Sequence, residues 1–213
     1  MRRLLVSVVA MVVAMLGVAC DSAGSGGVYP LTVGNKWTND SYVLRGPTQS
    51  TLDTLQTSTI VVNVLKKDEL NSGPSAFQVL STSTIHWFSP DTNYVMSGYS
   101  FMREADGAIL SYSSRSDTVP DTLAFEDMTV GKTWHDGRGL PVEVVDQENV
   151  TVKAGTYTDA FKIKYLDVYD SDTFPVYRWY AMDVGEVRTD YEFTPMSGFT
   201  QVFHSELASA TIK

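Results

Sequence analysis

The sequence predicts an all-β, mostly antiparallel domain, a meander of short strands that forms a curved sheet, a half-barrel or a sandwich. Apolar residues alternate with polar ones, or gather in β-branched and aromatic runs, along most of the 213 residues. Gly, Pro, Asn and Asp separate these runs at short intervals. Helical periodicity is confined to the N-terminal segment and to a short turn near Asp68.

Residues 1–19 are predicted to be a signal peptide that precedes this domain. Arg2 and Arg3 provide a basic start, and an uncharged run rich in Val, Ala and Met occupies 4–19. This run is shorter than the roughly 20 residues that cross a bilayer as a helix. A permanent transmembrane anchor is the alternative, but no basic stop-transfer cluster follows the run.

The signal ends in Leu-Gly-Val-Ala-Cys at 16–20, which resembles the bacterial lipobox, where the cysteine is acylated and becomes the mature N-terminus. The lipobox usually has leucine three residues before the cysteine, whereas Gly17 stands there and Leu16 is one residue further back. Gly17 and Ala19 also fit ordinary secretory cleavage, which would leave a free thiol. Cys20 is the only cysteine, so it can form no intramolecular disulfide, and lipidation explains its position. The predicted lipidation site is therefore Cys20, attaching the protein to a membrane of the cell envelope, outside the cytoplasm, in a leaflet left open.

Residues 20–27 are rich in Gly and Ser and are expected to form a flexible tether to one all-β domain at 28–213. The formal charge of the whole chain is −9. Without Arg2 and Arg3, 14 basic and 25 acidic residues leave a charge of −11. An acidic surface repels phosphate backbones and anionic headgroups, which excludes nucleic acid as an expected partner.

The strands are expected between turn signals that can be located one by one. The charged residues 66–69 are expected to end the first strand in a turn, and Asp106-Gly107 between apolar runs predicts a hairpin. The polar residues 146–149 predict another hairpin. In order, the predicted strands are 57–65, 76–88, 94–103, 108–114, 141–145, 150–153, 159–168, 174–181, 186–193 and 199–207.

The clearest alternation lies at 159–168. Phe161, Ile163 and Tyr165 are predicted on one face of that strand. Lys162 and Lys164 are predicted on the other, as in a half-buried strand.

One short motif occurs twice. Leu-Thr-Val-Gly-Asn-Lys-Trp ends at Trp37, and Met-Thr-Val-Gly-Lys-Thr-Trp ends at Trp134. We expect Gly34 and Gly131 to adopt a positive φ in a tight turn, with each Trp packing back across it. The match is too short to prove duplication, but it predicts one strand-entry turn used twice, in two similar halves of the sheet.

Three segments together resemble a group of uncharacterised bacterial lipoproteins. They are Tyr-Pro-Leu-Thr-Val-Gly-Asn-Lys-Trp at 29–37, Val-Lys-Ala-Gly-Thr-Tyr with Ala160-Phe161 at 152–163, and Trp-Tyr-Ala…Val-Gly-Glu-Val-Arg at 179–188. The group carries a Pro-Leu-x-Val-Gly-Asn-x-Trp opening, an Ala-Gly-Thr-aromatic turn and a Trp-Tyr-Ala…Val-Gly-x-Val strand pair in that order. The resemblance implies an exported all-β domain and no particular chemistry.

No arrangement of residues predicts catalysis, a cofactor or a metal. His86, His135 and His204 lack the spacing of a zinc site and are expected in the core or on strand faces. The nucleophile motif Gly-x-Ser-x-Gly is absent. Three aspartates at 167–172 offer oxygen ligands without the spacing of a calcium loop, so a solvated acidic turn is expected and calcium remains an alternative.

The expected function depends on whether the tryptophans are buried or exposed. Trp37, Trp87, Trp134 and Trp179 are expected mainly as core residues, although exposed aromatic rings on a β-sheet can stack on sugars or line an apolar groove. The expected function is a non-enzymatic binding or structural module of the envelope, its partner an envelope protein, a glycan or an apolar ligand. The alternatives are a carbohydrate- or apolar-ligand-binding domain and a secreted hydrolase. The sequence predicts no ligand-binding residues.

Overall fold

The structure is a computed structural model that describes residues 27–169, 171–195 and 198–213. The predicted signal peptide, Cys20 and the tether up to residue 26 lie outside the described residues. Within them the regular structure is β, apart from one short 3₁₀ turn, η1 (Gln49–Thr51), which confirms the predicted fold class. A search of the same residues finds no helix with the length and apolar character of a membrane span.

All the strands of the described residues belong to a single antiparallel sheet. Its order across the sheet is β6-β5-β4-β3-β2-β1-β12-β11-β10-β9-β8-β7, so the first and last strands pair in the middle and β6 and β7 form the edges. In chain order the strands are β1 (Lys36–Gly46), β2 (Asp53–Glu69), β3 (Ser75–Phe88), β4 (Asp91–Ala105), β5 (Ala108–Tyr112), β6 (Asp121–Phe125), β7 (Thr133–His135), β8 (Pro141–Val152), β9 (Gly155–Tyr169), β10 (Asp172–Ala181), β11 (Gly185–Phe193) and β12 (Thr200–Thr211).

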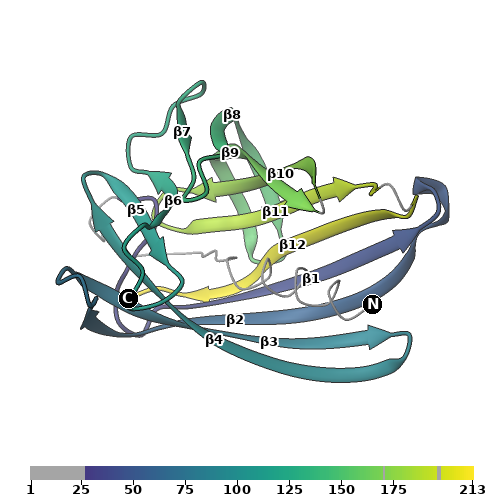
Figure 1. Cartoon of the computed structure of the whole chain (residues 1–213), viewed down its shortest axis with the longest axis horizontal. Coiled ribbons are helices and arrows are strands. Elements are labelled where there is room, and N and C mark those ends of the chain that lie inside the picture. Colours follow the sequence, from purple (N-terminus) through teal and green to yellow (C-terminus); the bar gives the residue numbers. More distant parts are fainter. Residues whose placement is uncertain (1–26, 170, 196–197) are drawn as a thin grey trace.

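The sheet curls until its two edges nearly meet (Figure 1). β6 and β7 do not pair, but side chains of the second half bond to the backbone of β6. Trp134 Nε1 on β7 donates to Thr122 O at 3.1 Å, and the Tyr165 hydroxyl on β9 donates to Leu123 O. The outcome is a barrel-like sheet that is almost closed, and not a sandwich of two sheets.

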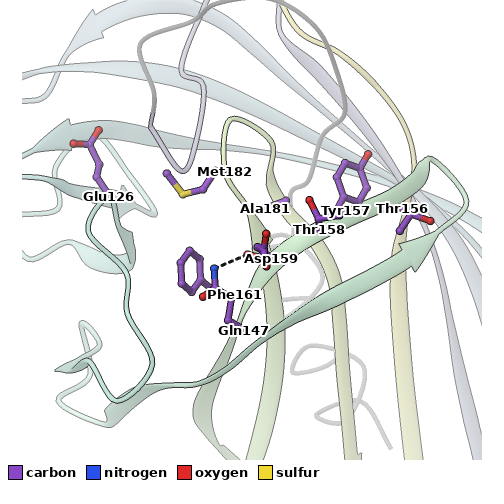
Figure 2. A pocket seen from close by; sticks show the side chains of 9 residues that line it. All are labelled: Glu126, Gln147, Thr156, Tyr157, Thr158, Asp159, Phe161, Ala181 and Met182. Carbon is purple, nitrogen blue, oxygen red and sulfur yellow. Dashed lines mark hydrogen bonds between the residues drawn. The ribbon is translucent and has the colours of Figure 1, made fainter.

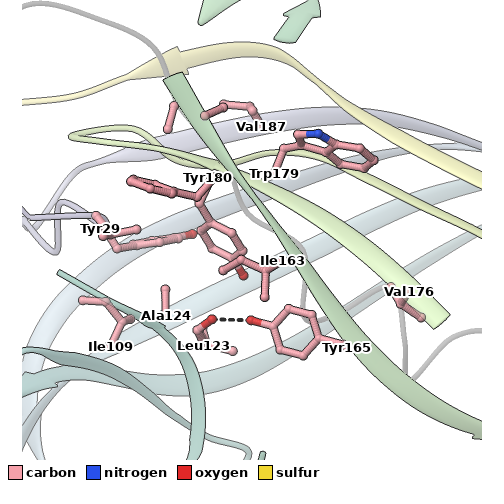
Figure 3. Close-up of a cluster of buried hydrophobic side chains, with 14 of the residues drawn as sticks. Tyr29, Ile109, Leu123, Ala124, Ile163, Tyr165, Val176, Trp179, Tyr180 and Val187 are labelled. Atoms are coloured by element: carbon pink, nitrogen blue, oxygen red, sulfur yellow. Dashed lines mark hydrogen bonds between the residues drawn. The ribbon is translucent and has the colours of Figure 1, made fainter. Parts of the chain in front are cut away.

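The inner face of the curled sheet holds the main core. Phe161, Ile163 and Tyr165 are buried there, while Lys162 and Lys164 lie on the opposite face, as the alternation predicts. Figure 3 shows how Ile163 and Tyr180 of the second half approach Ile109 and Ala124 of the first. One apolar cluster therefore joins both halves of the chain.

The repeated motif forms the same turn twice. Gly34 and Gly131 have φ values of +93° and +91°, which confirms the predicted positive φ. Each glycine N–H donates at 2.8 Å to a carbonyl oxygen in the second strand after the turn: Gly34 to Val64 of β2, and Gly131 to Val144 of β8. A β-bulge follows both valines. β1–β6 and β7–β12 thus begin alike, as two similar halves of the sheet.

Two predicted turns are wrong. Residues 146–149 do not form a hairpin, because β8 continues through them to Val152 and the turn lies at 152–155. Residues 66–69 are the end of β2, and the chain turns at 70–74 instead, so no helical turn forms near Asp68. β-Bulges lie beside both polar segments and shift the register of the strand pairing there. The polar segments therefore remain part of their strands. Strands β1, β6 and β7 were not predicted from the sequence.

Candidate functional site

The three histidines do not come together as a metal site. His135 is exposed, whereas His86 and His204 lie on the outer face of the sheet. His86 Nδ1 is 3.0 Å from Asn93 Oδ1, and His204 Nδ1 is 2.6 Å from Asp190 Oδ1. No group of three or more His, Cys, Asp or Glu side chains suited to a metal occurs among the described residues.

The acidic segment at 167–172 is tied to a neighbouring loop. Asp167 Oδ1 accepts a hydrogen bond from Arg138 Nη1 at 2.6 Å, and the same guanidinium bonds Asp136 at 2.8 Å. Asp170 lies outside the described residues. An arginine that occupies the carboxylate of Asp167 competes with a cation there, which argues against calcium at this residue. Asp167 lies in β9 and not in a turn.

The core role predicted for the tryptophans is confirmed for three of them. Trp37 is 0% exposed, Trp134 9% and Trp179 5%. Trp37 Nε1 donates to Val184 O at 3.2 Å. Trp179 belongs to the same buried cluster, and the charged ends of Lys162 and Arg188 lie 5.0 and 4.8 Å from its ring centre. These rings are therefore covered and are not platforms for a ligand, while Trp87 is half-buried.

Small polar side chains cross the inner face of the first half of the sheet. The pairing places Ser205 of β12 opposite Ser41 of β1, and Ser41 opposite Ser58 of β2. Ser81 of β3 lies opposite Gly98 of β4. We call this buried strip the inner polar lane: Asn39, Ser41, Gln56, Ser58, Ser81, Ser83 and Ser205.

The inner polar lane contains hydrogen-bonding atoms that the described protein does not satisfy. Ser41 Oγ and Ser58 Oγ bond each other at 2.6 Å. Asn39 Nδ2, Gln56 Oε1 and Ser81 Oγ are buried and have no hydrogen-bond partner. A buried polar atom without a partner costs about 1–3 kcal/mol, and folded proteins contain few of them. Asn39, Gln56 and Ser81 therefore leave three polar groups of the inner face unsatisfied within the described protein.

An aromatic wall borders this lane on the second half of the sheet. Phe174 of β10 stacks on Phe193 of β11, with ring centres 4.5 Å apart. Tyr191 of β11 stacks on Phe203 of β12 at 5.1 Å, with ring planes only 8° apart. Phe203 precedes Ser205 on the inner side of β12, so the apolar wall and the polar lane adjoin.

A charged pair is buried further along the same inner face. Arg178 of β10 and Glu186 of β11 approach to 3.8 Å. Tyr180 donates to Glu186 at 3.2 Å, Thr189 also donates to that carboxylate, and the Arg178 guanidinium lies 4.6 Å from the ring centre of Tyr165. Figure 3 shows Tyr165 and Tyr180 within this part of the core.

A β-bulge directs Glu186 inward. Tyr180 pairs with Glu186 while Trp179 pairs with Arg188, so Val187 is the extra residue on β11. Without the bulge, Glu186 would share the outer face with Arg188. The burial that follows raises the pKa of Glu186 to about 7, although Arg178, Thr189 and Tyr180 act to lower it.

A hollow lies beside the β8–β9 turn (Figure 2). Its volume is about 560 Å³, and its walls are mostly polar. Gln147 Nε2 donates to Asp159 O at 3.2 Å. Glu126 lines it on the opposite side from Asp159, and burial together with Glu126 raises the pKa of Glu104 nearby. The hollow can hold a small polar molecule, but its two carboxylates do not face each other as an acid–base pair.

The polar and charged residues of the inner face were not predicted from the sequence, in contrast to its apolar residues Phe161, Ile163 and Tyr165. Val176, Arg178 and Tyr180 occupy alternate positions of β10, so Arg178 is a charged residue in an otherwise apolar series. This break in the pattern is a signal by which Arg178 could have been identified. The inward direction of Glu186 depends on a bulge, for which the sequence carries no comparable signal. Serines and asparagine on alternate positions of β1–β3 resemble an ordinary solvent face, which concealed the inner polar lane.

Comparisons with known proteins establish the fold. No family model matches the chain, and no curated protein does. The chain is similar to a crystal structure from Bacteroides fragilis described as a "putative exported protein with YmcC-like fold", at 17% identity and a TM-score of 0.52, covering 88% of this chain and 100% of that one. It is also similar to a "putative lipoprotein" from Parabacteroides distasonis, at 16% identity and a TM-score of 0.43, covering 89% and 100%. The first likeness shows that the chain has the YmcC-like fold.

Proposed function

We propose that the protein is an exported, lipid-anchored envelope protein that acts as a non-enzymatic binding module. The signal peptide and Cys20 support export and anchoring, and the Bacteroides fragilis protein of the same fold is described as exported. The inner face of the curved sheet is the binding site.

The unpartnered polar atoms of the inner polar lane carry this proposal. Asn39 Nδ2, Gln56 Oε1 and Ser81 Oγ provide one donor, one acceptor and one hydroxyl that can do either. They adjoin the stacked rings of the aromatic wall, which offer apolar contact. A ligand with an apolar chain and uncharged polar groups, such as a hydroxylated lipid, satisfies both surfaces at once.

A lipid on Cys20 would also orient the domain relative to the membrane. Asp183 N, in the β10–β11 turn, donates to Gly27 O at 3.0 Å, and the Tyr29 ring packs against Gly185. The chain therefore joins the domain at this turn. Residues 20–27 span at most about 25 Å when fully extended, so lipidated Cys20 would keep the β10–β11 turn close to the membrane.

Binding of a fluorescent monoacylglycerol tests the site, because that probe has an apolar chain and an uncharged hydroxylated head. We expect the domain to bind it, and Ser81→Phe, which fills the lane, to weaken binding at least tenfold. Thr82→Phe is the matched control, since the next residue of β3 lies on the other face and bonds Ser97. Gln56→Leu removes one unpartnered acceptor at similar volume and should weaken binding less.

Native mass spectrometry of protein purified from its own host provides a second measurement, with an expected co-purifying lipid. Absence of binding by the unaltered domain, together with absence of any co-purified lipid, would contradict the proposal. Equal effects of Ser81→Phe and Thr82→Phe would also contradict it, because a site on the inner face distinguishes the two.

A further inference from the structure

A separate hollow lies on the outer face of the sheet, across β12, β1, β2 and β3. Its volume is about 430 Å³. One row of paired residues crosses its floor: His204 opposite Tyr42, Tyr42 opposite Thr57, and Thr57 opposite His86. We call this hollow the outer slot. It lies on the opposite side of the sheet from the inner polar lane, because Ser41, Ser58 and Ser205 of the same strands face inward.

Two aromatic side chains stand at the sides of the outer slot, and neighbours hold both in place. Tyr42 is 38% exposed and stacks on His204 with ring centres 5.0 Å apart. His204 is itself held by Asp190 at 2.6 Å. His86 is held by Asn93 at 3.0 Å. Rings fixed before binding lose little conformational entropy when a ligand arrives.

The strand spacing leaves room for one further ring between Tyr42 and His86. Both residues pair with Thr57, so their backbones are two strands apart, or about 9–10 Å across the sheet. A ring held between two others needs about 7–8 Å, from two van der Waals contacts of about 3.5–4 Å. Thr57 between them has a short side chain, so the floor of the slot stays open.

The next row of the sheet provides hydrogen-bonding groups at the edge of the slot. Thr59 Oγ1 donates to Asp40 Oδ1 at 3.0 Å, and Lys153 Nζ donates to Asp40 Oδ2 at 3.0 Å. Lys153 also lies 3.6 Å from Glu206 Oε1, and the Thr84 hydroxyl lines the same hollow. Carboxylate, ammonium and hydroxyl groups thus lie along one edge of the space between Tyr42 and His86.

We propose that the outer slot binds a neutral saccharide, a function beyond the lipid site proposed for the inner face. A pyranose ring presents apolar C–H faces to Tyr42 and His86 and hydroxyls along its edge to Thr59 and Asp40. The acidic chain and the carboxylates of Asp40 and Glu206 disfavour an anionic sugar. A flat aromatic molecule fits the space between the rings but leaves the polar edge unused.

Saturation-transfer NMR and titration calorimetry test this proposal with uncharged probes: disaccharides of glucose, galactose, mannose and N-acetylglucosamine, and caffeine as a planar aromatic. We expect at least one disaccharide to bind, and Tyr42→Ala to weaken it at least tenfold. Thr57→Trp, which fills the floor, should abolish binding. Tyr99→Ala is the control, because Tyr99 is 56% exposed on β4 and lies outside the slot.

Thermal unfolding confirms that each variant is folded before binding is compared. Failure of every disaccharide to bind would overturn the proposal, as would binding of caffeine without any saccharide. Equal loss in Tyr42→Ala and Tyr99→Ala would overturn it too, since that result places the sugar elsewhere. The monoacylglycerol measurement uses another probe and another face, so the two proposals fail separately.

Discussion

Single residues join segments that are far apart in the chain. Tyr29 packs on Gly185, and Trp37 Nε1 bonds Val184 O, so the 29–37 and 179–188 segments meet in space. The Ala-Gly-Thr turn contacts β12, where Ala154 N donates to Leu207 O at 3.0 Å. Contacts between these segments therefore join parts of the sheet that are far apart in the chain.

Gly185 provides the first prediction. Its φ is +96°, and a Cβ there would lie 2.8 Å from the Tyr29 ring, whereas Gly131 has a φ of +91° and open space around it. Gly131→Ala should therefore cost only the backbone strain, about 1 kcal/mol. Gly34→Ala should cost a similar amount, because the side chain in its way is the flexible Lys213. Gly185→Ala should cost about 2–3 kcal/mol, since overpacking adds to the strain.

Urea unfolding of the three alanine variants measures these differences. Equal losses at Gly185 and Gly131 would show that Tyr29 moves aside freely and that the contact between the two segments is loose.

Glu186 provides a prediction about pH. Burial raises its pKa from 4.5 to about 7, so the folded protein holds this proton more tightly than the unfolded chain. Its contribution to stability is then complete below about pH 4.5 and is lost as the pH rises to about 7. We expect the free energy of unfolding to fall across this range, by at most about 1.4 kcal/mol per pH unit.

Glu186→Gln should flatten that fall, because glutamine has a similar shape and no proton to lose. Glu192→Gln is the control, since Glu192 is exposed on the same strand. Urea unfolding in steps of one pH unit measures both, and an unchanged pH profile in Glu186→Gln would assign the effect to other groups.

At the scale of elements, turns and bulges decide where strands begin and which way their side chains point. The same turn starts β1 and β7, with matching bonds to Val64 and Val144 and a tryptophan three residues after each glycine. Bulges then bend β2, β8 and β11. Because a bulge increases local twist, these irregularities help a sheet of this width to curl until its edges approach.

Truncating the two tryptophans tests this role. Trp37→Ala and Trp134→Ala should each lose about 3 kcal/mol or more, because a buried ring leaves a cavity. Val33→Ala and Val130→Ala are matched controls in the same turns, and their exposed side chains should change stability by no more than about 0.5 kcal/mol. Thermal melts of the four variants measure the contrast. Unaltered melting in both tryptophan variants would contradict the core role of these rings.

At the scale of the whole molecule, the curved sheet has an inner face and an outer face. Gly27 and Tyr29 contact the β10–β11 turn. The β3–β4 hairpin is long, and β4 pairs with β5 only from Phe101 onward. Residues 91–100 of β4 therefore form an open edge with Val95 and Tyr99 exposed.

Lipidation of Cys20 is the prediction at this scale. Cys20→Ser should abolish labelling by an alkyne fatty acid and release the protein from membranes, because the apolar run of the signal is too short for a stable span. Fractionation of host cells measures the release. Retention of the unlabelled variant in membranes would instead support a permanent transmembrane anchor.

The sequence by itself determined the class of the fold and much of its local detail. Alternation at 159–168 placed Phe161, Ile163 and Tyr165 on the buried face, and the repeated Thr-Val-Gly predicted the positive φ of Gly34 and Gly131. The Asp106-Gly107 turn also forms, with φ values of +53° and +71°. These features depend on side-chain period and on glycine, which act over a few residues.

The tertiary structure alone decided the features that involve distant residues. Glu186 faces Arg178 because of a bulge on β11, and polar residues 146–149 stay in a strand because β9 pairs with them. Tyr42 and His86 are far apart in sequence but lie in the same row of the sheet, because each pairs with Thr57. Register between strands depends on how the whole inner face packs, and local propensity does not encode it.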